Sequence, residues 1–284
     1  MSSAYSFSNS VSASVDHITY DVLDSAPQLA ADLPRFLLEK GVFTKGALKG
    51  QSYSIVIAHP NDVDAIHQVS ETELKHERLK GKQNLKPRSK EQISKNLSIN
   101  LSTQPESGGA VVMLLKDDNT LLAMGGVVLV DEPETAGRGD MFSKCDLDKQ
   151  IVMNMAVTHP HYQGMGLTNY IYYHRLNIAT LFSEERGSPK PREYVVVKVA
   201  GSETKEFYET KQGFTRDGHD LLLPDVAEPD NLLTTLGMTM DDICTKVQTK
   251  RPDIYANGLT LTHLHENNRA TPTVLSHAAL RAIS

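Results

Sequence analysis

The residues with the clearest chemical potential lie at 155–168 and read Met-Ala-Val-Thr-His-Pro-His-Tyr-Gln-Gly-Met-Gly-Leu-Thr. An apolar strand is expected to end at the His-Pro pair, and an aromatic-rich helix begins after a loop of small residues. Such a loop directs several backbone N–H groups toward one point at the positive end of the helix dipole. Glycine at 164 and 166 lets an oxygen atom approach the backbone closely. The stretch predicts an anion site, with phosphate as the expected anion; a plain strand–helix turn is the alternative.

The elements that would position this loop alternate between strands and helices, which is typical of a mixed α/β (α+β) fold. The strands are expected at 53–58, 110–115, 121–130, 151–157, 194–199 and from 213 toward 223, and the helices from about 62, from 89, at 167–182 and at 203–211. The helix at 167–182 is apolar on nearly all sides and is expected to be buried. Its tyrosines and His174 are therefore interpreted as packing groups.

The chain divides into four parts on composition. Residues 1–14 are rich in serine and are expected to be disordered. Residues 15–50 are expected to form an N-terminal helical extension, with a short helix at 33–41 that has proline in its first turn and glycine as its C-cap. Residues 51–223 form the main domain. Residues 224–284 are interpreted as a C-terminal extension or a small second module.

Charge and composition narrow the possible partners. The formal net charge of −6 argues against a general nucleic-acid binder. The stretch 75–95 carries eight basic and two acidic residues, so nucleic acid, another anion or a solvated helix face could each account for it. The two cysteines suit a reducing compartment, and we find neither a secretory signal nor an apolar run long enough to span a bilayer. We expect a cytoplasmic protein without a membrane partner; a secreted bacterial effector is the alternative.

Three segments resemble the GCN5-related N-acetyltransferases. The spacing Gln163-x-x-Gly166-x-Thr168 is similar to the family's pyrophosphate loop, Arg/Gln-x-x-Gly-x-Gly/Ala, and the strand 152–157 precedes it as in the family. The segment 206–214, Glu-Phe-Tyr-Glu-Thr-Lys-Gln-Gly-Phe, resembles the signature Phe/Leu-Tyr-Glu-Lys-x-Gly-Phe with one residue added. The resemblance covers 53 to about 223. It departs from the family at Thr168, where glycine or alanine is usual, and at Gly201, where asparagine is common.

The resemblance implies a GNAT-like, strongly twisted mixed sheet whose central parallel strands, 151–157 and 194–199, splay apart to hold acetyl-CoA or another acyl-CoA. The tyrosine of the third segment, Tyr208, would give a proton to the departing thiolate. A backbone N–H near Ala156 and Val157 would stabilise the oxyanion. The implied cofactor-binding residues are Met155, Ala156 and Val157 for the pantetheine arm, and Gln163, Gly164, Met165, Gly166, Leu167 and Thr168 for the pyrophosphate.

The function that follows is an acyl-CoA-dependent N-acyltransferase, which transfers acetyl to a primary amine of a small molecule or protein by direct attack. The candidates for the base are Glu73, Asp146, Asp148 and His159, and the sequence does not choose among them. No metal is expected, because the nearby His263 and His265 have no evident partner ligands. The alternatives are a non-catalytic acyl-CoA binder or sensor, and an interaction protein whose C-terminal segment fills the acceptor cleft. The acceptor and the oligomeric state stay open.

Overall fold

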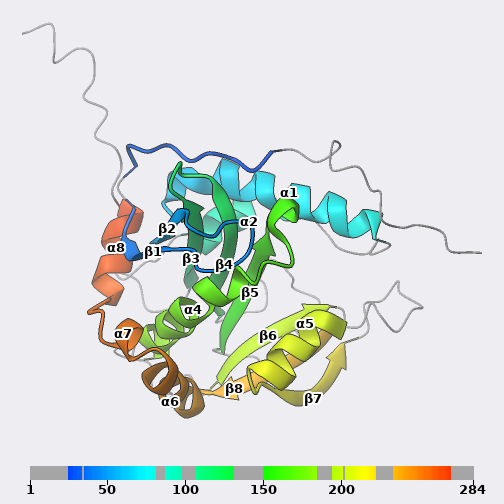
Figure 1. The fold of residues 1–284 in the computed structure, drawn as a ribbon. Coiled ribbons are helices and arrows are strands. Elements are labelled where there is room, and N and C mark those ends of the chain that lie inside the picture. Colours follow the sequence, from blue (N-terminus) through cyan, green and yellow to red (C-terminus); the bar gives the residue numbers. More distant parts are fainter. Residues whose placement is uncertain are drawn as a thin grey trace, which may run out of the picture.

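The computed structural model describes residues 25–33, 35–80, 87–97, 107–130, 150–183, 194–200, 202–221 and 233–269. These residues form an α+β fold around an eight-stranded sheet in the order β1-β2-β3-β4-β5-β6-β8-β7 (Figure 1). The strands are β1 (Leu37–Val42), β2 (Ser52–Ile57), β3 (Ser107–Lys116), β4 (Leu121–Val130), β5 (Gln150–Thr158), β6 (Tyr194–Ala200), β7 (Thr215–Leu221) and β8 (Leu233–Thr239).

The direction of the strands changes at one place near the centre of the sheet. Strands β1 to β5 pair in antiparallel fashion, each with the next. Strand β6 is parallel to β5, and this ladder runs from Ile151↔Val195 to Met153↔Val197. Strand β8 then lies antiparallel between β6 and β7. The β5–β6 junction therefore joins two antiparallel halves of the sheet.

Helices cover both faces of the sheet, which explains why its central strands read as continuous apolar runs. Helix α4 (Thr168–Ser183) packs on one face, in a core that includes Val112 and Leu114 of β3. Helices α1 (Val63–Leu79) and α2 (Lys90–Asn96) pack on the other, where the intervening residues of β3 point. The α4 side also carries α5 (Ser202–Glu206), α6 (Met240–Lys250), α7 (Pro252–Tyr255) and α8 (Leu261–Arg269).

The predicted succession of elements from 53 to 221 is confirmed. The strands expected at 110–115 and 121–130 are β3 and β4, the expected buried helix is α4, and the strands at 151–157 and 194–199 are β5 and β6. The residues at 1–14, for which disorder is predicted, lie outside the described residues. Within the described part of the chain, no helix is both long and apolar enough to cross a membrane.

The predicted helix at 33–41 is wrong, since 37–42 form strand β1, which extends the sheet beside β2. Gly41 does not cap a helix. A Cβ at this position would lie 2.5 Å from Oη of Tyr53, so the glycine makes room for that ring across the two strands. Pairing with β2 and packing of Tyr53 override the local helical signals.

The interpretation of 224–284 as an extension or a second module is also wrong. Residues 233–239 form β8, which pairs with both β6 and β7 and is therefore internal to the sheet. The C-terminal helices complete the core on the α4 side. In α8, Asn267 accepts a hydrogen bond from Phe36 N at 2.7 Å and donates one to Ala58 O at 3.0 Å. The C-terminal segment thus holds the N-terminal strands in place.

Candidate functional site

A His-Pro turn sets the start of the predicted anion loop. At the end of β5, His159 begins the short 3-10 helix η3 (Pro160–Tyr162), and its Nδ1 accepts a hydrogen bond from His161 N at 3.4 Å. The proline at the first position of η3 fixes the backbone there. His159 is fully buried. This residue, one of the four candidate bases, therefore acts as a helix cap at this turn.

The loop that follows presents a row of backbone donors. Gly164 and Gly166 have φ of +77° and +71°, in the left-handed region that glycine adopts at little cost. Helix α4 begins at Thr168, and within the described residues the N–H groups of 164–168 have no hydrogen-bond acceptor. The hydroxyl of Thr168 lies 3.4 Å from that of Thr158, beside these donors. The geometry is that of an anion cradle at a helix N-terminus.

Gln163 has a different position from the rest of the predicted loop residues. Its N–H is bonded to Pro160 O at 3.3 Å, and its side-chain amide donates to Thr158 O at 3.4 Å. Its Oε1 accepts from Nζ of Lys80 at 3.1 Å, and it also hydrogen-bonds to His76 of α1. Gln163 therefore braces the loop against α1, and the open donors begin at Gly164.

Strand β5 carries a bulge immediately before the loop. Pairing with β4 passes from Met124↔Val157 to Gly126↔Asn154, so that two residues of β5, 155 and 156, oppose Gly125 alone. Met155 has φ of +52°, which is uncommon for a residue other than glycine. Its sulfur accepts a hydrogen bond from Nδ2 of Asn96, at 3.0 Å. The strained residue is thus held by a contact from α2.

The bulge coincides with a change in exposure along the strand. Met155 and Val157 are buried, whereas Ala156 between them is exposed. The described ladder between β5 and β6 has already ended at Met153↔Val197. Three of the predicted cofactor-binding residues, 155–157, therefore lie on a part of β5 that pairs with β4 alone.

A buried arginine supports the bulge from the α4 face, and the sequence analysis did not identify it. Arg175 is fully buried, and its Nη2 donates to Gly126 O and to Asn154 O, both at 3.0 Å. Its Nε and Nη1 have no hydrogen-bond partner among the described residues. The glycine pair 125–126 inside an apolar strand was the available signal, because such glycines mark close approaches and bulges.

Tyr208 lies on the same face of the sheet, in a π-helical turn, η4 (Phe207–Lys211), that continues α5. The N–H of Gln212 bonds to Phe207 O at 3.1 Å, and this i→i+5 spacing accommodates the residue by which 206–214 exceeds the family signature. Tyr208 is 2% exposed, and its Oη has no partner within the described part of the chain.

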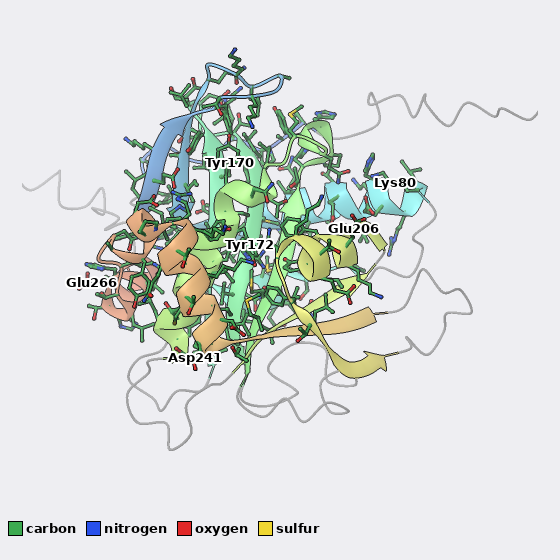
Figure 2. The ribbon with its side chains drawn as sticks, turned by 60° about the horizontal axis from the view of Figure 1, so that its bottom comes forward. Lys80, Tyr170, Tyr172, Glu206, Asp241 and Glu266 are labelled. Atoms are coloured by element: carbon green, nitrogen blue, oxygen red, sulfur yellow. The ribbon has the colours of Figure 1, made fainter. Side chains whose placement is uncertain are left out.

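Tyr172 links Tyr208 to helix α4. The two rings lie 6.4 Å apart, and Figure 2 shows Tyr172 near the centre of the molecule. The Oη of Tyr172 is also buried without a partner in the described structure, and burial raises the pKa of this phenol. Polar groups so deep in a core normally have partners. Two neighbouring rings whose hydroxyls both lack a partner among the described residues therefore mark a region that can receive a polar ligand.

Of the other three candidate bases, the structure describes Glu73 alone. Glu73 of α1 lies near Arg88, where its charge opposes the lowering of the arginine pKa by burial. Asp146 and Asp148 lie outside the described residues. Burial lowers the pKa of His76, with a further contribution from Lys80. In the described ranges no three His, Cys, Asp or Glu side chains gather as a metal site would require.

Part of the basic stretch 75–95 is engaged in ion pairs. Lys80 pairs with Glu77 at 3.0 Å, and Lys90 pairs with Asp64 at 2.6 Å. Residues 81–86 lie outside the described structure. The binding of nucleic acid by this stretch stays a prediction.

Comparison with known proteins finds distant resemblances to solved structures. No protein-family model and no curated protein matches the sequence. A mutant spermidine N-acetyltransferase SpeG from Vibrio cholerae is 10% identical, with a TM-score of 0.41 over 68% of this chain and 97% of that chain. FeeM, an N-acyl amino acid synthase from uncultured soil microbes, is 11% identical, with a TM-score of 0.47 over 69% and 94%. The ribosomal-protein-S18-alanine N-acetyltransferase from Escherichia coli is 11% identical, with a TM-score of 0.42 over 66% and 94%. At these identities and TM-scores the likeness assigns no family and no activity to this chain.

Proposed function

We propose that this protein is a cytoplasmic, acyl-CoA-dependent N-acyltransferase that transfers acetyl to a primary amine. The observation that carries the proposal is that the described pairing of β5 with β6 ends at Met153, just before the anion loop. Beyond this residue the strand has lost its pairing with β6, Ala156 is exposed, and the next loop offers open N–H groups at 164–168. A gap in a sheet that leads to an anion cradle suits a long ligand with an amide-containing arm and a diphosphate.

The unpaired part of β5 suits the amide-containing arm. Backbone N–H and C=O groups of a strand need partners, and a ligand with its own amides can supply them in place of a neighbouring strand. Residues 155–157 would bind this arm, and the donors at 164–168 would bind the diphosphate. The unpartnered Oη of Tyr208 supports the same assignment, since a polar ligand between β5 and β6 would give it a partner.

When bound, acyl-CoA would supply the thioester that is attacked by the amine. Tyr208 would then donate a proton to the departing sulfur, a contribution of about 10²–10⁴ in rate for a well-placed acid. The N–H groups at Ala156 and Val157 are suited to donate to the thioester oxygen as it gains charge. Arg175 would act as a positioning residue, because its guanidinium donates to the carbonyl oxygens of Gly126 and Asn154, the residue pair next to the bulge in β5.

The acceptor amine must lose a proton before it attacks, because a free alkylamine with a pKa near 10.4 is mostly protonated at neutral pH. We expect it to approach from the α1–α2 face, which the side chain of Met155 and its partner Asn96 line. A small-molecule amine and a protein amine both suit this direction. The residue that removes the proton is not assigned.

Calorimetric titration with acetyl-CoA tests the cofactor, and release of free CoA with a panel of amines tests turnover. We expect binding, turnover with at least one amine, and a Tyr208→Phe variant whose kcat falls by about 10²–10⁴ with similar affinity for acetyl-CoA. Tyr255→Phe is the matched control, because this tyrosine is 43% exposed. The absence of binding at millimolar acetyl-CoA would reject the proposal. Binding without turnover would favour a non-catalytic acyl-CoA binder.

A further inference from the structure

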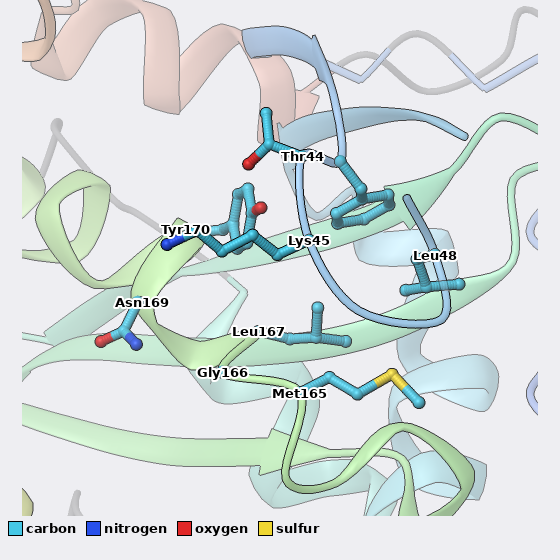
Figure 3. A pocket seen from close by; sticks show the side chains of 9 residues that line it. Thr44, Lys45, Leu48, Met165, Gly166, Leu167, Asn169 and Tyr170 are labelled. Atoms are coloured by element: carbon cyan, nitrogen blue, oxygen red, sulfur yellow. The ribbon is translucent and has the colours of Figure 1, made fainter. Parts of the chain in front are cut away.

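A hollow of about 340 Å³ lies between the β1–β2 loop and the beginning of α4 (Figure 3). It is at the small end of the range for small-molecule pockets. Its size suits one ring system rather than a whole coenzyme. One wall comes from the β1–β2 loop and the other from the anion loop and the first turn of α4. The lining residues are Phe43, Thr44, Lys45, Leu48, Met165, Gly166, Leu167, Asn169 and Tyr170.

The hollow is continuous with the anion loop, because Met165 and Gly166 belong to both. Their N–H groups are two of the five open donors, and both residues also line the hollow. A ligand whose diphosphate rests on the loop therefore has its next group at the mouth of the hollow. Met165 is 37% exposed there, and its flexible thioether can pack on a flat ring.

The back of the hollow is built for an aromatic group. The ring of Tyr170 is held edge-on by Phe43 at 5.4 Å and by Tyr53 at 5.1 Å. The β1–β2 loop is itself closed by backbone hydrogen bonds, including Phe43 N to Gln51 O at 2.9 Å and Gly50 N to Phe43 O at 2.8 Å. The apolar surface is therefore in place before a ligand arrives, which lowers the entropic cost of binding.

The rim of the hollow is polar and positive. Lys45 and Thr44 are exposed on the loop, and the Lys45 amino group and the Asn169 amide lie on the same side of the hollow in Figure 3. An ammonium, a hydroxyl and an amide together suit a phosphate monoester. An aromatic ring and a phosphate monoester, attached to a diphosphate, are the features of the nucleotide end of coenzyme A.

We propose that this hollow binds the adenine ring of acyl-CoA and that Lys45 pairs with its 3′-phosphate. The inference rests on the proposed function, because it needs the diphosphate on the loop at 164–168. It assigns to strand β1 and its loop a role in binding the coenzyme. It also predicts that the protein distinguishes CoA from the analogue that lacks the 3′-phosphate.

The test is calorimetric titration of CoA and of 3′-dephospho-CoA into the full chain and two variants. We expect the wild type to bind CoA about 2–5-fold more tightly, as one ion pair of an exposed lysine allows. Lys45→Ala should bind both compounds equally, with the affinity for 3′-dephospho-CoA unchanged. Lys49→Ala is the matched control, because Lys49 is an exposed lysine of the same loop that does not line the hollow.

The outcomes separate this inference from the function on which it rests. If the wild type binds both compounds equally, or if both lysine variants lose the same discrimination, the assignment of the hollow is wrong and the proposed function stands. If neither compound binds at millimolar concentration, the proposed function fails and this inference fails with it. Tyr170→Leu should lower the affinities for CoA and for 3′-dephospho-CoA by a similar factor. Unchanged affinities would contradict the binding of the adenine ring in the hollow.

Discussion

Arg175 and Gly125 compete for the same space beneath the sheet: a Cβ on residue 125 would lie 2.6 Å from Nε and 2.7 Å from Cδ of Arg175. The guanidinium is fully buried and is held by two carbonyl oxygens. It cannot move away without leaving these acceptors unpaired. Gly125→Ala should therefore lower the free energy of unfolding by about 1–3 kcal/mol, the usual cost of overpacking a core. Urea denaturation measures this change.

Gly237→Ala is the matched control for the crowding at Gly125. Gly237 is also in an internal strand, but its added Cβ would meet only Val195 O at 3.8 Å, an ordinary contact. This variant should change the free energy of unfolding by less than about 1 kcal/mol. Equal losses in the two variants would show that strand propensity, rather than Arg175, sets the cost. In an Arg175→Ala background the cost of Gly125→Ala should largely disappear, since the crowding atoms are gone.

Glu39 of β1 makes the stability depend on pH. Its carboxylate accepts hydrogen bonds from Tyr53 at 2.7 Å, His174 at 2.9 Å and Arg251 at 2.7 Å. Burial raises the pKa of Glu39, but these donors outweigh burial and lower the pKa from 4.5 to about 2. The stabilisation is therefore complete above about pH 5 and is lost as the pH falls toward 2. At about 1.4 kcal/mol per pKa unit it amounts to at most about 3 kcal/mol.

Glu39→Gln should remove the contribution of Glu39 to the loss of stability at low pH. The variant should be less stable than the wild type at pH 7, and the two free energies of unfolding should converge as the pH approaches 2. Asp64→Asn is the control, since Asp64 also has a lowered pKa but is paired with Lys90 at an exposed position. A constant difference between Glu39→Gln and the wild type from pH 7 to pH 2.5 would contradict this account.

Gly164 and Gly258 form a matched pair that separates backbone strain from ligand binding. Their φ angles are +77° and +72°, and an added Cβ would meet no atom within 4 Å at either position. Alanine should cost each variant about 1 kcal/mol of stability through the left-handed backbone alone. Only Gly164→Ala should weaken the binding of acetyl-CoA, measured by calorimetry, because only this Cβ enters the anion cradle. Equal affinities in the two variants would count against a diphosphate at this loop.

The sequence predicted the elements that obey one local pattern. The continuous apolar runs of β3, β4 and β5 and the apolar helix α4 are such local patterns, and all are found near the expected positions. Strand β1 was mistaken for a helix because Pro34 and Gly41 are helix-end signals in isolation. The structure uses Gly41 to seat the ring of Tyr53, a contact with a residue that follows twelve positions later. Such packing has no signature in a single segment.

The candidate site likewise contains residues that the sequence predicted and residues that it did not. The loop at 163–168 and Tyr208 were predicted because their spacing resembles family motifs, whereas Arg175 belongs to no motif. Its role depends on two carbonyls that become adjacent only when β4 and β5 pair around the bulge. The left-handed Met155 was equally hidden, because nothing in its residue type favours a positive φ. Ala156 is exposed because the pairing between β5 and β6 ends before it. The end of this pairing depends on the three-dimensional arrangement of the two strands and has no signal in the sequence.

The position of β8 leads to the last prediction, which concerns truncation after residue 223. If the C-terminal segment only filled an acceptor cleft, its removal would leave a folded and more active domain. The structure gives it a structural part instead. Strand β8 pairs with β6 over seven residue pairs, and Asn267 of α8 hydrogen-bonds to Phe36, which precedes β1, and to Ala58, which follows β2. Without β8, strand β7 loses its partner and β6 becomes an edge. We expect residues 1–223 alone to lack cooperative thermal unfolding, and Asn267→Ala in the full chain to lower the free energy of unfolding by about 1–3 kcal/mol. A soluble, cooperatively folded 1–223 fragment would contradict this assignment and would return the C-terminal segment to a regulatory role.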